Sequence, residues 1–262
     1  MPPTTELYHG ARGAAVVVPV TTRSETEREL TATLVSEHLI FEGDIRLGTR
    51  HSRGLSADRK RATVVSDVAR LWPRGLVPFE LALRLPGQDR VFDAITHWQE
   101  LTPIRFVERT QENSFEEGFD AWLSFEEDEG CSSDIGRTGG RQIVTLGSDC
   151  SKGNAIHEIG HAVGLWHEQS REDRGTHIAI LFGNIERGCD YNFDQQIADG
   201  DDVGDYDFGS IMHYGPLAFS RNGRPTIEPL VPAPAGVEMG QRNALSEGDI
   251  AAVKALYGTV SA

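Results

Sequence analysis

Residues 157–174 read "HEIGHAVGLWHEQSREDR", and the first eleven of them contain three histidines and a glutamate. Residues four apart lie on one face of an α-helix, so a helix here would present His157 and His161 to a common point. Glu158 would lie beside that point, where a side chain suits a base acting on a metal-bound water better than a ligand. The spacing therefore predicts a metal site on a helix.

Gly164 determines whether the third histidine can join the pair. A continuing helix would carry His167 away, but a glycine can take the left-handed conformation that ends a helix and folds the chain back. Three protein ligands with an open position for water are typical of catalytic zinc, whereas four ligands close a structural site. We therefore predict one catalytic Zn²⁺ held by His157, His161 and His167.

Two other interpretations compete with this one. A bare His-Glu-x-x-His also occurs on ordinary polar helix faces, and the third histidine, reached through a glycine, argues against that reading. A structural zinc site is the second alternative, but such a site has no use for the carboxylate of Glu158. Both are less favoured than a catalytic site.

The full run resembles the signature of the astacin family, within the metzincin zinc endopeptidases. The residues at its fixed positions are His157, Glu158, His161, Gly164, His167, Glu168, Arg171, Asp173 and Arg174. "SIMHY" (210–214) is similar to the family's methionine-containing turn. This implies Met212 beneath the zinc and Tyr214 as an extra, displaceable ligand. Taken alone, Met212 would be interpreted as a core methionine, and we assign His213 no catalytic role.

The resemblance covers residues 62–262 and implies the fold class. We expect an α+β, metzincin-like (zincin-like) catalytic domain with an active-site cleft between two subdomains. The upper one, about 62–165, would have a twisted mixed sheet and two long helices. The lower one, 166–262, would be rich in loops and end in a helix.

Hydrophobic periodicity predicts several elements directly. Residues 77–83 alternate like a half-buried strand, and 88–101 place Val91, Phe92, Ile95, Trp98 and Leu101 on one helical stripe. Further strands are expected at 104–108, 121–125 and 142–146. Ser246 with Asp249 predicts a capped helix ending at Gly258, and 175–240 should be mostly loops. A similar capping pair, Ser24 with Glu27, predicts a helix to about Leu39.

Three cysteines are too few for a disulfide-rich scaffold and lack Cys-x-x-Cys spacing. From their number alone, one disulfide plus one thiol and three reduced thiols both remain open. The resemblance implies a disulfide between Cys131 and Cys150, and hence an oxidising compartment. The family's second disulfide has no counterpart, and Cys189 is expected to be a buried or idle thiol.

The N-terminal segment resembles a family pro-segment through "FEGDI" (41–45). The resemblance implies that residues 1–61 are inhibitory, with Asp44 on the zinc in place of the catalytic water. Residues 51–61 are polar and basic, as in an exposed linker. Cleavage after Arg61 by a trypsin-like protease would start the mature chain at Ala62, and its new N-terminus would reach Glu168. The same basic residues would also suit a linker without special purpose.

The implied activity is hydrolysis of peptide bonds in proteins or peptides. Glu158 would act as the general base and Tyr214 would stabilise the oxyanion. The substrate would lie along an edge strand, for which the resemblance indicates 121–125. A zinc-bearing binding protein that no longer cleaves is the alternative, and the presence of Glu158, Tyr214 and Asp44 together disfavours it.

Composition argues against nucleic acids and membranes as partners. The 262 residues include 25 Lys+Arg against 40 Asp+Glu, a net charge of −15, which disfavours nucleic acid and anionic membranes as partners. The longest N-terminal apolar run (13–20) is too short to span a bilayer. It is also a poor signal peptide, so we expect a secreted monomer whose leader was removed or which is exported by another route.

Overall fold

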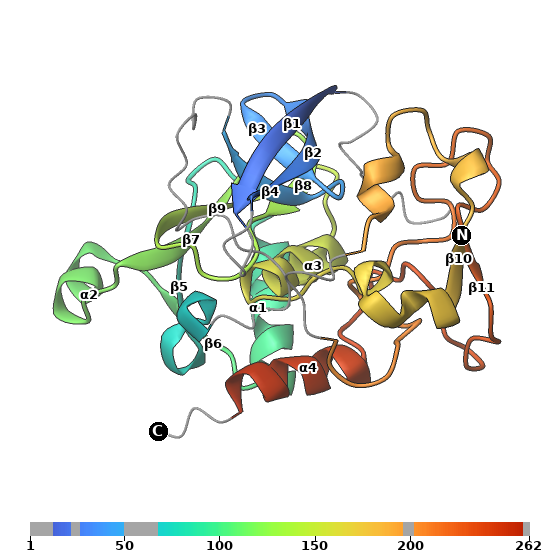
Figure 1. Cartoon of the computed structure of the whole chain (residues 1–262). Helices are drawn as coiled ribbons and strands as arrows, with labels where there is room; N and C mark the ends of the chain where they lie inside the picture. The colour runs from blue at the N-terminus through green and yellow to red at the C-terminus, as the bar shows by residue number, and fades with distance from the viewer. Residues whose placement is uncertain (1–12, 22–26, 50–67, 196–201, 259–262) are drawn as a thin grey trace.

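The computed structural model describes residues 13–21, 27–49, 68–195 and 202–258 (Figure 1). The expected cleavage bond, Arg61–Ala62, and Ser24 of the expected N-terminal helix cap lie outside these ranges. Within them, no helix is long and apolar enough to cross a membrane.

Within the described ranges, nine strands form one sheet, which begins with β1 (Ala14–Thr21), β2 (Glu27–Val35), β3 (His38–Phe41) and β4 (Ile45–Thr49) and continues in the order β8-β9-β7-β5-β6. Four of its strands run parallel to their neighbours: β5 (Leu76–Leu81), β6 (Arg105–Glu108), β7 (Ala121–Glu126) and β9 (Gly140–Leu146). The short pairing of β4 with β8 is also parallel. The short strand β8 (Cys131–Ser133) runs antiparallel to β9. Helices α1 (Asp89–Leu101) and α3 (Lys152–Ala162) pack on each other and contribute to the main core with the sheet. The predicted α+β class with a mixed sheet is confirmed.

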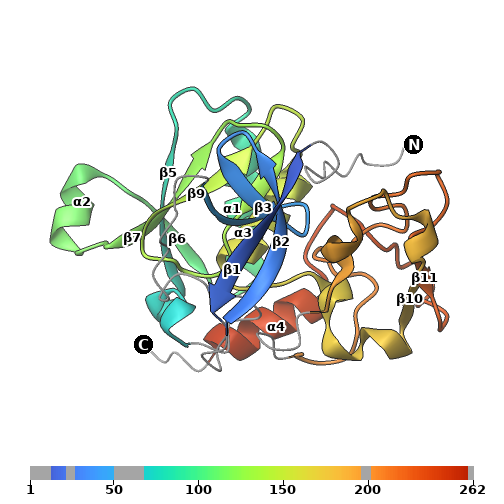
Figure 2. The ribbon, with the colours of Figure 1, turned by 45° about the horizontal axis from the view of Figure 1, so that its top comes forward.

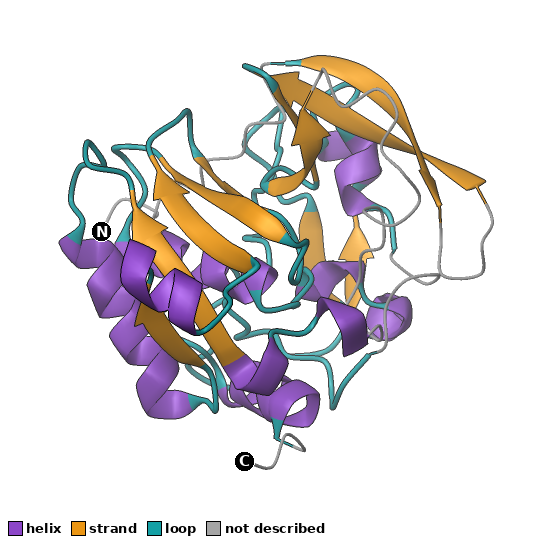
Figure 3. Cartoon of the chain, turned by 90° about the vertical axis from the view of Figure 1, so that its left-hand side faces the viewer, coloured by secondary structure: helices purple, strands orange, loops and turns teal. Residues whose placement is uncertain are grey.

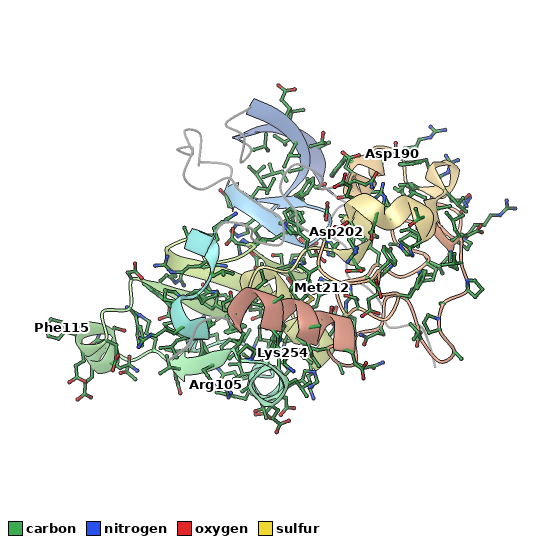
Figure 4. The ribbon with its side chains drawn as sticks, turned by 60° about the horizontal axis from the view of Figure 1, so that its bottom comes forward. Arg105, Phe115, Asp190, Asp202, Met212 and Lys254 are labelled. Atoms are coloured by element: carbon green, nitrogen blue, oxygen red, sulfur yellow. A yellow bond between two sulfur atoms is a disulfide. The ribbon has the colours of Figure 1, made fainter. Side chains whose placement is uncertain are left out.

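Helix α1 matches its prediction in extent but not on every face. Val91, Ile95 and Trp98 are buried, whereas Phe92 and Leu101 are 42% and 37% exposed. The buried stripe is therefore narrower than the apolar pattern suggested. Helix α2 (Gln111–Glu116) was not predicted, and its Phe115 points away from the body of the molecule (Figure 4).

The predicted helix from Ser24 to Leu39 is wrong. The chain instead forms β1 (Ala14–Thr21), β2 (Glu27–Val35), β3 (His38–Phe41) and β4 (Ile45–Thr49), each antiparallel to the next. In β2, Leu30, Ala32 and Leu34 follow the period of two that suits a strand, and they pack with apolar residues of β1 and β3. The local capping signal is overridden by this pairing. β1 and β2 extend beyond the rest of the sheet (Figures 2 and 3, at the top of Figure 3).

A strand forms at 121–125 as predicted, but its predicted place at the edge of the sheet is wrong. β7 is hydrogen-bonded to β5 on one side and β9 on the other, so it has no edge to offer a substrate. Strand β8 contacts the histidine helix α3, as does its neighbour β9. The outer side of β8 pairs with β4, with Ile45 opposite Ser133.

The C-terminal part is loop-rich, as predicted, and lies to one side of the sheet (Figures 1 and 2). It has one small sheet of β10 (Ile178–Ile180) and β11 (Ile227–Pro229) over its own apolar cluster. Helix α4 (Glu247–Tyr257) has the predicted capping box of Ser246 and Asp249. It ends without a left-handed residue, because Gly258 has φ −70°.

Candidate metal centre

Helix α3 begins at a capping box and carries the first two histidines. The side chain of Ser151 accepts from Asn154 N, and that of Asn154 accepts from Ser151 N. These two hydrogen bonds satisfy N–H groups at the start of the helix that have no partner within the helix. The last carbonyls of α3 are also satisfied, because Trp72 Nε1 donates to Ala162 O at 2.8 Å and Tyr257 Oη donates to Val163 O at 2.8 Å. Both helix ends are therefore fixed by named contacts.

The chain reverses directly after α3. Gly164 has φ +108°, a conformation that residues with a Cβ rarely adopt. Its N–H donates to His161 O at 2.8 Å, and Leu165 N donates to Gly160 O at 2.8 Å. The turn brings the ring of His167 within 4.8 Å of the ring of His161, measured between centroids.

The three histidines present equivalent nitrogen atoms to one point. Their Nδ1 atoms each lie 2.8 Å from an acceptor oxygen: Ile211 O for His157, Leu165 O for His161 and Glu42 Oε2 for His167. An oxygen acceptor requires the proton on Nδ1, which leaves Nε2 as the ligating atom.

Asp44 lies over these Nε2 atoms. Its carboxylate oxygens are 3.2 Å from His157 Nε2, 3.5 Å from His161 Nε2 and 3.2 Å from His167 Nε2. One ligand atom from each of the four residues lies within 4.8 Å of the others. His161 Nε2 and Asp44 Oδ1 are buried and make no hydrogen bond within the described residues. Two such buried atoms facing each other fit a tetrahedral Zn²⁺ between three imidazoles and a carboxylate.

The pKa shifts of His157, His161 and Asp44 suit that set, whereas the shift of His167 favours a protonated ring, which a metal ion must deprotonate on binding. Burial lowers the pKa of His157 and His161, so both rings are neutral and can bind a metal. Burial also acts to lower the pKa of His167, but the charges and hydrogen bonds of Asp44 and Glu42 raise it to about 9. Burial opposes ionisation of Asp44, yet the three histidines hold its pKa well below the usual range.

Glu42 is a site residue that the sequence reasoning missed. Besides its carboxylate contact with His167, its backbone carbonyl accepts from Tyr214 Oη at 2.5 Å. Glu42 and Gly43 have φ +45° and +78°, so the turn between β3 and β4 is left-handed at two successive residues. The motif contained this glutamate, but a glutamate in a turn is normally exposed. Only the folded turn shows it completely buried.

The methionine turn (210–214) packs against α3, the helix that carries the first two histidines. Asp249 accepts from Ser210 Oγ at 2.6 Å and from Ile211 N at 2.9 Å, so α4 holds the turn. Met212 is buried in the interior (Figure 4) and approaches α3 at Gly160. A Cβ on Gly160 would come within 2.7 Å of Met212 Sδ, so the close approach depends on the glycine.

The tail of the signature connects the site to the loops around 203–214. Glu168 Oε1 accepts from Asp207 N at 2.8 Å, and Arg171 pairs with Asp173 at 2.8 Å. Arg174 Nη1 donates to Gln169 O at 2.8 Å. Burial raises the pKa of Glu168 to about 8, and the nearby charge of Arg171 opposes that shift.

Glu158 lies next to the first histidine without joining the four-residue group. Its side chain is buried, and Oε2 makes no hydrogen bond within the described part of the chain. Burial and then the charge of Asp44 raise the pKa of this carboxyl well above its usual value.

The expected disulfide is present between Cys131 of β8 and Cys150, directly before α3. It ties the strand beside the site to the start of the histidine helix. Cys189 is a buried thiol, and burial raises its pKa.

Comparison with known proteins gives a consistent picture. Residues 64–258 match the family model described as Astacin, a family of peptidases. The chain is 37% identical over 231 residues to blastula protease 10 of Paracentrotus lividus, which covers 83% of this chain and 38% of that protein. It is 38% identical over 226 residues to zinc metalloproteinase nas-39 of Caenorhabditis elegans. That alignment covers 83% of this chain and 23% of nas-39. The chain thus spans less than half the length of these two relatives.

A solved structure extends the similarity to the fold. High choriolytic enzyme 1, a hatching enzyme zinc-protease from Oryzias latipes, superposes with a TM-score of 0.63 at 32% identity. The match covers 73% of this chain and 96% of that one. Given the family match over 64–258 and a buried three-histidine centre above a methionine turn, the chain belongs to the astacin family of zinc metallopeptidases.

Proposed function

We propose that this chain is a zinc-dependent endopeptidase that hydrolyses peptide bonds in proteins and holds one Zn²⁺. The observation that carries the proposal is the convergence of three buried histidine Nε2 atoms whose Nδ1 atoms are fixed by oxygen acceptors. The bound ion would lower the pKa of a water and polarise the scissile carbonyl. His157, His161 and His167 would hold it, and Met212 would support them from below.

Glu158 would transfer protons during the reaction, and Tyr214 would stabilise the negative charge of the oxyanion. Glu158 takes a proton from the attacking water and delivers it to the leaving amine. Tyr214 donates its hydroxyl proton in a hydrogen bond to the oxyanion. Its present partner, the carbonyl of Glu42, supports this role, because a substrate carbonyl in that place would receive the same hydrogen bond.

The same chain would be synthesised as a latent precursor. Residues 1–61 would be the pro-segment and 62–262 the catalytic domain, in two parts of about 62–165 and 166–262. Asp44 would take the open zinc position. Support comes from its contacts with all three histidines and from Ser133 N, which donates to Asp44 O at 3.0 Å and adds the segment to the edge of β8.

Activation would follow from cleavage between Arg61 and Ala62 by a trypsin-like protease. The new N-terminal ammonium would then approach Glu168. A cavity of about 50 Å³ beside Glu168 supports this, since the acids Asp202, Asp205 and Asp207 in its lining outnumber Arg171 and favour a further cation. The disulfide supports a secreted protein, because such bonds persist in oxidising compartments.

The test uses the full chain before and after limited trypsin treatment, followed by trypsin inhibition. Mass spectrometry locates the cleaved bond, while zinc content and casein or peptide hydrolysis are measured on both samples. Glu158→Gln should retain about one zinc per chain and lose roughly 10²–10⁴-fold in rate. A Glu158→Gln enzyme with full activity and bound zinc would refute the mechanism.

A further inference from the structure

His213 follows Met212 and precedes Tyr214, yet no step of the proposed reaction uses it. Its side chain is completely buried. Its Nδ1 lies 2.7 Å from Tyr214 O, an atom that can only accept a hydrogen bond, so Nδ1 carries a proton. Its Nε2 lies 2.8 Å from Tyr206 Oη. A fully buried imidazole whose two partners are a carbonyl and a hydroxyl is neutral, so Tyr206 donates to Nε2.

Tyr206 is fixed in place independently of His213. Its ring stacks on the ring of His177, with the centroids 4.7 Å apart and an angle of 9° between the planes. The next residue in the chain is also held, because Asp207 N donates to Glu168 Oε1 at 2.8 Å. The Tyr206 hydroxyl therefore extends from a fixed ring, and its hydrogen bond orients the imidazole of His213.

The backbone of Tyr214 is held at both of its peptide groups. Tyr214 N donates to Gln169 Oε1 at 3.0 Å, and Arg242 Nη1 donates to His213 O at 3.1 Å. These two contacts fix the peptide group before Tyr214. The carbonyl of the peptide group after it accepts from the His213 ring. Rotation of that ring would release the carbonyl and allow the main chain of Tyr214 to shift.

A fixed main chain matters because the Tyr214 hydroxyl would change partners. In the uncleaved chain the hydroxyl donates to Glu42 O, and in the proposed reaction it would donate to the oxyanion. The point that the hydroxyl reaches by side-chain rotation depends on where the main chain is held. A donor stabilises an oxyanion at about 2.7–3.1 Å, so a displacement of about 1 Å removes much of its effect.

We propose, on the basis of the peptidase function proposed above, that Tyr206 is a positioning residue for Tyr214 and acts through the neutral ring of His213. The Tyr206 hydroxyl orients His213, and His213 holds the carbonyl of the residue that donates to the oxyanion. Tyr206 lies outside the four-residue metal group. Its hydroxyl therefore contributes to the transition state and not to the binding of zinc or substrate.

The test uses the full chain after trypsin cleavage, with trypsin then inhibited. Tyr206→Phe keeps the ring that stacks on His177 and removes only the hydroxyl. It should lower kcat for a synthetic peptide by roughly 10-fold and change KM by less than about 2-fold, because only the transition state loses a contact. Its zinc content should equal that of the wild type.

A double-mutant cycle with Tyr214→Phe distinguishes positioning from a purely structural role. Once the Tyr214 hydroxyl is absent its position no longer matters, so adding Tyr206→Phe should lower kcat by less than about 2-fold further. Tyr257→Phe is the matched control, because it also removes a hydroxyl from a buried ring, and that hydroxyl donates to Val163 O. Tyr257→Phe should change kcat by the same factor with and without the Tyr214 hydroxyl.

His213→Asn is a second variant that breaks the same connection. Asparagine has no atom at the place of Nε2, so the contact with Tyr206 is lost. The kcat should fall in the wild-type background and stay unchanged in the Tyr214→Phe background. Thermal unfolding of each variant verifies folding, and His213→Asn covers the case in which Tyr206→Phe does not fold.

The outcomes separate this inference from the proposed function. An unchanged kcat in Tyr206→Phe, or an equal loss with and without the Tyr214 hydroxyl, would overturn the positioning role while leaving the peptidase intact. Full activity of Tyr214→Phe would instead overturn the proposed role of Tyr214, and the positioning role with it. Failure of the wild type to cleave any peptide, with zinc bound, would overturn the proposed function as a whole.

Discussion

Gly160 has only a hydrogen atom as its side chain, and this allows Met212 to approach α3 closely beside the candidate metal centre. A methyl group there would meet Met212 Sδ at 2.7 Å, so Met212 or α3 must shift. We expect Gly160→Ala to lower the free energy of unfolding by about 1–3 kcal/mol, the usual cost of overpacking a core. Gly183→Ala is the control, because no atom beyond the local backbone lies within 4 Å of the added methyl group.

Urea unfolding of both variants measures the difference. The same displacement should weaken zinc binding in Gly160→Ala, because His157 and His161 lie on the helix that shifts. Stability of Gly160→Ala equal to that of Gly183→Ala would show that Met212 adjusts without cost.

Sequence alone predicted the candidate site residues whose proposed chemistry depends on local spacing. His157, His161 and Glu158 follow from helical periodicity, and His167 follows from the glycine before it. Glu42 and Gly160 could not be found in this way. Their roles depend on His167 and Met212, which lie 125 and 52 positions further along the chain, and no local pattern encodes such contacts.

At the level of elements, the start of α4 helps to position the candidate site. Asp249 completes the capping box of α4 and also holds Ser210 and Ile211, whose carbonyl accepts from His157 Nδ1. One carboxylate therefore connects a helix start, the methionine turn and a histidine of the candidate metal centre.

Asp249→Ala should affect both stability and metal binding. Loss of the cap and of two buried hydrogen bonds should cost roughly 2–4 kcal/mol of unfolding free energy. Zinc affinity should fall by about 10-fold or more, as for other groups that orient a ligand from behind. Asp89→Ala, an exposed acid in the first turn of α1, should cost at most about 1 kcal/mol and leave zinc affinity unchanged. Calorimetry and zinc titration measure the two effects, and an unchanged affinity in Asp249→Ala would contradict the connection.

Elements were predictable where one periodicity dominated. The strands and helices of the catalytic part alternate or repeat clearly, so β5, β7, β9 and α1 were found near their observed bounds. The N-terminal helix failed because its capping pair is a local signal, whereas β2 is stabilised by pairing with β1 and β3. β8 has only three residues, too few to show alternation.

At the scale of the whole molecule, the N-terminal strands extend the catalytic sheet and place two carboxylates in the metal centre. Asp44 faces the three histidine Nε2 atoms, while Glu42 engages His167 and Tyr214 from the same turn. Latency would therefore depend on more than one residue.

Asp44→Ala in the uncleaved chain should produce detectable but partial activity. The zinc position opens to water, yet Glu42 still holds the Tyr214 hydroxyl and β4 still covers the edge of β8. We expect a peptidase rate above the uncleaved wild type and below the cleaved enzyme, measured with a short fluorogenic peptide. A completely inactive Asp44→Ala precursor with zinc bound would contradict the role of Asp44.

The same arrangement makes zinc retention a measure of the proposed inhibitory contact. In the intact chain the three histidines are buried, and Asp44 would supply a fourth ligand, as in closed structural sites. Cleavage and removal of the pro-segment would leave three protein ligands and access for solvent. A chromogenic chelator should therefore remove zinc at least ~10-fold more slowly from the intact chain than from the cleaved enzyme, because a closed four-ligand site must open first. Uncleaved Asp44→Ala should lose zinc at an intermediate rate, since β4 still shields the site without contributing a ligand. Equal rates for all three proteins would show that neither Asp44 nor the strand above it protects the metal.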